Sequence, residues 1–188
     1  MEKHQQQKEF LTEILINTKK IESFEDELIT IIPELIVCKN CEQNLPAHHL
    51  SVLNHIFEVV DGVRSDIILK LAALFHDIGK PYTKVTFNGV DNFCNHEKVS
   101  ELLADLILKR LEFENDVQHA VKLLIRYHDF ELSPTNDSLD AIAIKIGSKL
   151  VLPLLELQMS DLLAHSEQKV KQLISKRETT LKFYLENY

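Results

Sequence analysis

The chain of 188 residues has the length of a single domain, and its 45% hydrophobic and 27% charged residues are typical of a soluble globular protein. No apolar run approaches the ~20 residues that span a bilayer, and three cysteines do not make a disulfide framework, so we expect a cytoplasmic protein without a membrane partner. The net charge of −8 and the lack of a basic stripe argue against nucleic-acid binding and favour a small substrate.

Helical periodicity begins near the N-terminus. Apolar residues recur at helical spacing between Phe10 and Leu15. Ser23 and Asp26 predict a capping box for a second helix, which runs to Pro33. The first 32 residues are therefore expected to form N-terminal helices.

An irregular segment is predicted from Cys38 to Pro46. It contains Cys38-Lys-Asn-Cys41, a spacing found in redox pairs and in half zinc sites. No second pair accompanies it and the thioredoxin-type βαβ pattern is absent, so a structural role is favoured. The role of Cys38 and Cys41 stays open.

The most apolar stretch of the chain runs from Ile67 to Phe75 and predicts a helix buried on every side. It ends in His76-Asp77, and burying this pair is costly unless the side chains are paired or coordinated. Gly79 is expected to let the chain turn, and Pro81 to prevent the helix from continuing.

Helical and hairpin patterns flank this stretch on both sides. The predicted helix from Leu50 to Val60 carries His55 on its apolar stripe. After the central helix, Asn88-Gly89 is a strong hairpin signal and predicts at most a small two-stranded flap near residues 83–93. The later helices are predicted over His96–Leu111, Asn115 or Asp116 to His128, Asp137–Ile146, Leu150–Leu163 and Gln168–Glu186.

The expected fold class is all-α, as a single compact domain over residues 1–188. It divides into N-terminal helices over 1–32, a core over 33–165 and a C-terminal helix over 166–188. Polar residues on the inward faces of the predicted helices come from five segments and are His55, His76, Asp77, His96, His128 and Asp161. Buried charges are paired or bind metals. These nitrogen and oxygen donors suit a divalent ion such as Mn, Ni, Co, Fe, Mg or Zn, and the lack of thiolate argues against a closed structural zinc site.

The order His, His-Asp, His, His-Asp, Asp resembles that of the HD-domain metal-dependent phosphohydrolases. Pro33-Glu-Leu35, the run Leu69-Lys-Leu-Ala-Ala-Leu-Phe-His-Asp-Ile-Gly-Lys-Pro-Tyr-Thr83, and Phe93 with His96-Glu97 are most similar to the HD domain of bacterial tRNA nucleotidyltransferases and poly(A) polymerases. The resemblance covers roughly Ile31 to His165 and implies an HD-type helical domain. Those enzymes carry a nucleotidyltransferase head before this domain. Only some thirty helical residues precede it here, so we expect a free-standing HD module without nucleotide addition.

The resemblance also implies roles for individual residues. The metal ligands are His55, His76, Asp77 and Asp161. Asp77 and Lys80 are the catalytic residues, Asp77 holding the ion and the attacking hydroxide and Lys80 binding phosphate. His96 and His128 contact the substrate phosphate or bind a second metal, and His48 and His49 are outer-shell candidates. A single ion is slightly favoured, because Glu97 and Asp129 are expected to point about 100° away from the neighbouring histidines on a helix.

The function that the resemblance implies is hydrolysis of small phosphate esters, nucleotides above all, by attack of a metal-bound hydroxide. Phosphomonoesters and 2′,3′-cyclic phosphodiesters are the expected substrates. One alternative is a catalytically silent HD-fold binding or regulatory module, although a scaffold need not retain all six donors. A second is a guanosine polyphosphate hydrolase, disfavoured because the similarity points to the tRNA-processing branch. The expected partner is a small phosphorylated substrate, and the sequence leaves open the oligomeric state and any separate protein or RNA partner.

Overall fold

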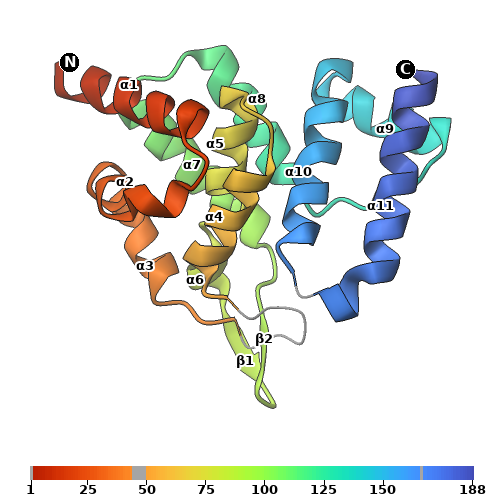
Figure 1. Ribbon diagram of the computed structural model, residues 1–188, viewed down its shortest axis with the longest axis horizontal. Helices are drawn as coiled ribbons and strands as arrows, with labels where there is room; N and C mark the ends of the chain where they lie inside the picture. The colour runs from red at the N-terminus through yellow and green to blue at the C-terminus, as the bar shows by residue number, and fades with distance from the viewer. Residues whose placement is uncertain (1, 44–49, 166) are drawn as a thin grey trace.

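The computed structural model describes residues 2–43, 50–165 and 167–188, and it confirms the all-α fold with one small hairpin (Figure 1). The helices are α1 (Glu2–Asn17), α2 (Glu25–Ile31), α3 (Ile36–Lys39), α4 (Val52–Gly62), α5 (Ile67–Phe75), α6 (Lys80–Thr83), α7 (His96–Arg110), α8 (Asn115–Tyr127), α9 (Asn136–Ile146), α10 (Val151–Leu163) and α11 (Glu167–Asn187). Short 3-10 turns lie at Ile21–Phe24, Pro33–Leu35 and Ser148–Leu150.

Helix α5 lies at the centre of the bundle, as its apolar sequence predicts. The side chains from Leu69 to Phe75 are all buried, and α1, α4, α7, α8 and α10 pack around them. Asp66 caps the helix, because its carboxylate accepts a hydrogen bond of 3.0 Å from Leu69 N. Even Lys70 is buried, where its ammonium donates to the carbonyl of Val60 at 2.6 Å. The end of α5 is therefore held in the interior on all sides.

The hairpin lies near the position that Asn88-Gly89 predicts. Strands β1 (Val85–Phe87) and β2 (Val90–Asn92) pair antiparallel, with Phe87 opposite Val90. Asn88 and Gly89 both have positive φ, at 48° and 75°, as a two-residue hairpin turn requires. The hairpin projects from the bundle and its tip points away from it (Figure 1). A turn at residues 93–95 connects its second strand to α7.

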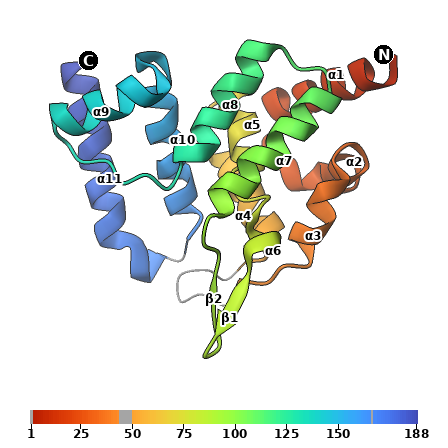
Figure 2. The same cartoon turned by 180° about the vertical axis from the view of Figure 1, so that it is seen from behind.

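The N-terminal and C-terminal segments cover opposite sides of the central helices. Helices α1 and α2 lie on one side, whereas α9, α10 and α11 lie on the other (Figures 1 and 2). Helix α11 packs along α10, and one hydrophobic core extends from Leu11 in α1 to Ala164 after α10. In the described part of the chain, no helix is long and apolar enough to cross a membrane.

Two local predictions near the N-terminus are wrong. Ser23 does not begin a capping box, because it lies within the 3-10 turn Ile21–Phe24 and no side-chain cap precedes α2. This turn is held by a distant contact, since the carboxylate of Asp61 accepts a hydrogen bond from Ile21 N at 3.0 Å. The segment that begins at Cys38 is also not wholly irregular, because Cys38 belongs to α3.

The turn after α5 also differs from the prediction in detail. Gly79 has a φ of −81°, which any residue can adopt, so it is not needed for conformational freedom. Pro81 stands near the start of α6, where a missing N–H costs nothing, rather than merely ending α5.

Candidate metal centre

The turn that carries His76 and Asp77, between α5 and α6, packs closely against α7 at Gly79. A Cβ at this position would lie 2.6 Å from both His96 O and Ser100 N, so a side chain cannot be accommodated without backbone movement. Gly79 N also donates to Ser100 Oγ at 2.9 Å. This close approach of the chain, rather than a turn, explains the glycine, and it brings the first residue of α7 next to Asp77.

One group of donors surrounds Oδ2 of Asp77, and we call it the inner half. It consists of His55 from α4, His76 at the end of α5, Asp161 from α10 and Asp77 itself. His55 Nε2 lies 2.9 Å from Asp161 Oδ1 and 3.4 Å from Asp77 Oδ2. His76 Nε2 lies 3.3 Å from Asp77 Oδ2 and 3.7 Å from Asp161 Oδ1. His55, His76 and Asp77 are fully buried.

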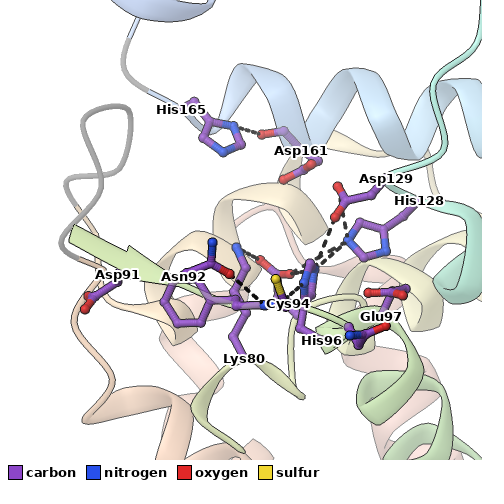
Figure 3. Close-up of a pocket in the computed structure, with 13 residues that line it drawn as sticks. Lys80, Asp91, Asn92, Cys94, His96, Glu97, His128, Asp129, Asp161 and His165 are labelled. Carbon is purple, nitrogen blue, oxygen red and sulfur yellow. Dashed lines mark hydrogen bonds and ion pairs between the residues drawn. The ribbon is translucent and has the colours of Figure 1, made fainter. Parts of the chain in front are cut away.

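A second group surrounds Oδ1 of Asp77, and we call it the outer half. His96 Nε2 lies 3.1 Å from Asp77 Oδ1 and 3.2 Å from His128 Nε2. His128 Nε2 lies 3.8 Å from the same Asp77 oxygen. Asp129 completes the group, with Oδ2 at 3.5 Å from His96 Nε2 and Oδ1 at 3.7 Å from His128 Nε2 (Figure 3). Both halves therefore contain two imidazoles and two carboxylates, and they share Asp77.

The histidines are oriented by the backbone. Nδ1 of His76, His96 and His128 lies 2.7–2.9 Å from a carbonyl oxygen three residues earlier in the chain. A carbonyl only accepts, so each Nδ1 carries the proton and each neutral imidazole has its lone pair on Nε2. This is the usual orientation of a metal-binding histidine.

The residues present fit a metal ion. His76 Nε2 and both oxygens of Asp77 are buried and, among the described residues, form no hydrogen bond of good geometry, although charged groups lie within 4 Å of them. The Nε2 atoms of His96 and His128 face each other at 3.2 Å, and two lone pairs at this distance require a proton or another cation between them. Buried acceptors arranged in this way are stabilised by a cation.

The pKa shifts show how charge is balanced without a metal. Burial opposes the ionisation of Asp77, but the positive charges of His76 and Lys80 outweigh it and hold the pKa of Asp77 well below its usual range. Burial likewise opposes protonation of His76, but Asp77 and Asp161 raise its pKa to about 10. The carboxylates of the site thus stabilise positive charge. Without a metal this charge is the proton on His76, and a metal ion supplies it instead when it displaces that proton.

Lys80 lies beside the shared carboxylate. Its ammonium is 2.6 Å from Asp77 Oδ2 and 3.1 Å from Gln43 Oε1, and it lies 5.5 Å from the centre of the Phe93 ring. Burial lowers the pKa of Lys80, but Asp77 and Asp161 outweigh it and the net pKa is raised, so Lys80 stays cationic.

A cleft of about 400 Å³ opens above the centre (Figure 3). Its walls come from β2 with the following turn, from α7, from the end of α8 and from α10. Lys80, His96, His128, Asp129 and Asp161 all line it. A small ligand in this cleft therefore contacts both halves of the centre.

The structure brings together all six donors that the sequence predicts, together with Lys80. His48 and His49 lie outside the described residues. Cys38 and Cys41 are buried free thiols outside the centre, and burial together with the Asp77 charge raises the pKa of Cys38, which favours an unreactive structural residue.

Two further side chains at the centre are not among the donors predicted from the sequence, namely Asp129, which is expected to point away, and His165. The prediction that Asp129 points away is wrong, because His128 is the C-cap of α8 and the helical rotation of 100° per residue no longer applies beyond it. The repeated pair His128-Asp129, which matches His76-Asp77, was the signal available. His165 follows Asp161 by four residues and lines the cleft, a helical spacing that also could have revealed it.

The corner that carries His128 and Asp129 is held by Gln158 of α10. Gln158 Nε2 donates to Tyr127 O at 3.3 Å and to Phe130 O at 2.8 Å, the carbonyls on either side of the pair. Gln158 Oε1 accepts from Arg177 Nη1 at 2.6 Å, and Arg177 belongs to α11. The C-terminal helix thus supports the outer half through one buried amide.

Comparison with known protein families shows to which family the chain belongs. Residues 47–152 match the family model described as the HD domain. The chain belongs to the HD domain family. This confirms the family that the ordered histidines and aspartates indicate in the sequence.

The relatives of this HD chain include tRNA nucleotidyltransferases, as the sequence resemblance predicts. An A-adding tRNA nucleotidyltransferase of Deinococcus radiodurans is 31% identical over 61% of this chain and 28% of the relative. A multifunctional CCA protein of Janthinobacterium sp. is 32% identical over 52% of this chain and 24% of its own length. A CC-adding tRNA nucleotidyltransferase of Thermus thermophilus is 29% identical over 80% of this chain and 36% of its own length. The match thus spans about a quarter to a third of the length of these enzymes.

Proposed function

We propose that this HD-domain chain is a metal-dependent hydrolase of small phosphate esters, with nucleotides as the substrate class. The observation that carries the proposal is the carboxylate of Asp77, which is buried and divides its two oxygens between two groups of imidazole and carboxylate donors at the base of a cleft. Nucleotides are favoured because the relatives are named for adding nucleotides to tRNA.

The charge of the cleft supports metal dependence. The acidic side chains that line it are Asp77, Asp91, Glu97, Asp129 and Asp161. Asp91 is paired with Lys84 at 2.9 Å, which leaves four carboxylates and the cation Lys80. An anionic phosphate is repelled by this cleft unless further cations are bound. We therefore propose an ion in each half, and the carboxylate of Asp129 is what makes the outer half equivalent in donors to the inner half.

A bound divalent ion supplies Lewis-acid polarisation of the phosphoryl group and activation of water. The protein supplies positioning and charge. His55, His76 and Asp161 are the proposed ligands in the inner half, His96, His128 and Asp129 in the outer half, and Asp77 in both. Asp77 and Asp161 are ionised in the metal-free site. They stay ionised when a bound ion takes the place of the imidazole protons, so they can also accept the hydrogen bond of a water and orient it. Lys80 is placed to neutralise charge that develops on a phosphoryl oxygen.

A phosphate-release screen tests this function. Nucleoside monophosphates, 2′,3′-cyclic monophosphates and guanosine polyphosphates are supplied in turn, each with Mn²⁺, Ni²⁺, Co²⁺, Fe²⁺, Mg²⁺ or Zn²⁺ added to chelator-treated protein. We expect release from monoesters or cyclic diesters that depends on the added ion and is lost in Asp77→Ala.

The other outcomes separate the alternatives. Release from guanosine polyphosphates alone would support the polyphosphate hydrolase. Metal binding without release from any substrate would support a catalytically silent binding module instead. Release that is unaffected by chelator would contradict a metal-dependent reaction.

A further inference from the structure

His165 stands at the inner side of the cleft, outside the set of donors that the sequence predicts. It follows Ala164, the C-cap of α10, and it lies four residues after Asp161. Its ring centre is 5.1 Å from that of His55, and it lines the cleft as a partly buried side chain. Figure 3 shows the ring beside Asp161, on the far side of the cleft from His96 and His128.

The orientation of His165 matches that of the proposed ligands. Its Nδ1 lies 2.8 Å from the carbonyl oxygen of Asp161, so Nδ1 carries the proton and the lone pair of the neutral ring is on Nε2. His76, His96 and His128 are arranged in the same way, each by a carbonyl earlier in its own segment. A backbone carbonyl thus orients His165 as a nitrogen donor in the same way as His76, His96 and His128.

The position of His165 also suits one particular ion. One donor atom each from His55, Asp161 and His165 can be chosen so that all three lie within 4.8 Å of one another. Ligands of a single ion have separations in this range, because metal–nitrogen and metal–oxygen bonds are about 2.0–2.2 Å long. Asp161 belongs to α10, and His55 Nε2 lies 2.9 Å from its Oδ1 within the inner half.

We propose that His165 is a further ligand of the ion in the inner half, an inference that rests on the proposed function. The ion then has three imidazole donors, from His55, His76 and His165. Nitrogen donors favour the later transition metals over Mg²⁺ and Mn²⁺. His165 therefore biases the inner half toward ions such as Co²⁺, Ni²⁺ or Zn²⁺, and the outer half lacks this third imidazole.

The test is titration of metal-free protein with Co²⁺ alone, with the visible absorption spectrum and competition against a chelator as readouts. In His165→Ala, the Kd of the ion in the inner half should rise at least about tenfold, and the absorption bands should change because the coordination changes. The Kd for Mn²⁺ should rise less than that for Co²⁺. His165→Asn is the second variant, because its amide N–H can still donate to Asp161 O while no donor nitrogen remains, and it should behave like His165→Ala.

Two controls separate coordination from a structural effect. His119→Ala removes an exposed histidine of α8 outside the cleft and should change neither Kd nor spectrum. Added imidazole should restore the parent spectrum in His165→Ala, because the side chain lines an open cleft.

The outcomes distinguish this inference from the proposed function. If the parent binds Co²⁺ and both His165 variants keep its Kd and spectrum, the inference is overturned and the proposed function stands. If the parent binds no Co²⁺, Ni²⁺, Zn²⁺ or Mn²⁺, both fail together.

Discussion

Apart from His165, the two halves of the centre have the same types of donor but different surroundings. Each contains two imidazoles and two carboxylates and shares Asp77. The unshared carboxylate differs most, since the side chain of Asp161 is 18% exposed whereas that of Asp129 is 58% exposed. A buried set of donors fixed by helices α4, α5 and α10 is preorganised for a retained ion, whereas an open set at the cleft suits an ion that exchanges or arrives with substrate. The comparison teaches that donor identity alone does not determine the role of a metal position.

The largest effect is expected where the halves join. Asp77→Ala removes one oxygen from each half, so metal binding should be weakened in both and hydrolysis should fall by at least about 10²–10³-fold. Circular dichroism should show the parent helix content, and the metal-free variant should be less heat-stable because buried Lys80 loses its carboxylate partner. The matched control is Asp137→Ala, an exposed aspartate in the first turn of α9. An Asp77→Ala protein that hydrolyses as fast as the parent would show that the centre is elsewhere.

The unshared carboxylates allow the halves to be separated. Asp161→Asn and Asp129→Asn are the same chemical change in equivalent positions. Isothermal titration with Mn²⁺ should resolve a tight and a weak ion in the parent. We expect Asp161→Asn to weaken the tight ion and Asp129→Asn to weaken only the weak one, each by about tenfold or more. Equal effects of both variants on a single binding event would mean that the halves hold one ion between them.

A smaller effect is expected at the support of the outer half. Gln158→Leu leaves the carbonyls of Tyr127 and Phe130 without this donor, and stability should fall by about 1–3 kcal/mol. The corner that carries Asp129 should loosen, so the weak ion should bind more weakly while the tight ion is little changed. Gln118→Leu is a matched control, because this buried glutamine also donates to a backbone carbonyl, that of Phe113, but lies outside the cleft. If Gln118→Leu weakens the ion equally, the effect belongs to general stability.

The smallest effect is expected from an ion pair outside both halves. Arg110 donates to both carboxylate oxygens of Glu34, from Nη1 at 2.6 Å and from Nη2 at 2.9 Å. Burial would raise the pKa of Glu34, but the hydrogen bond and charge of Arg110 outweigh it and lower the pKa below its ordinary value of 4.5. The stabilisation is therefore complete above that value and is lost as the pH falls through the lowered pKa.

Glu34→Gln should accordingly cost about 1 kcal/mol or less at pH 7, and this difference should shrink as the pH falls from 4.5 through the lowered pKa of Glu34 in the folded protein. Metal affinity should not change. Urea unfolding at several pH values measures the first effect. A difference that grows on acidification would contradict a lowered pKa of Glu34 in the folded protein.

Helical periodicity gives the direction of donors that lie within helices but not of side chains beyond helix ends. His76 and Asp77, at and beyond the end of α5, are predicted instead from the buried apolar run that they follow. His55 and Asp161 occupy inward stripes, where periodicity determines direction. Asp129 and His165 follow the C-caps of α8 and α10, where the chain leaves the helix and only the tertiary structure fixes the side chain. The same limit applies to Gly79. It must be a glycine because a side chain there would collide with Ser100 on α7, a contact that the sequence pattern does not show.

Metal retention during chelation tests the central claim most directly. Protein loaded with Co²⁺ is mixed with an excess of chelator, and the ions that remain per chain are followed over time by native mass spectrometry. The different exposure of the two halves predicts two ions per chain at the start, rapid loss of one and slow loss of the other. A single ion at saturation, or two ions lost at one common rate, would contradict a centre with a retained inner ion and an exchangeable outer ion.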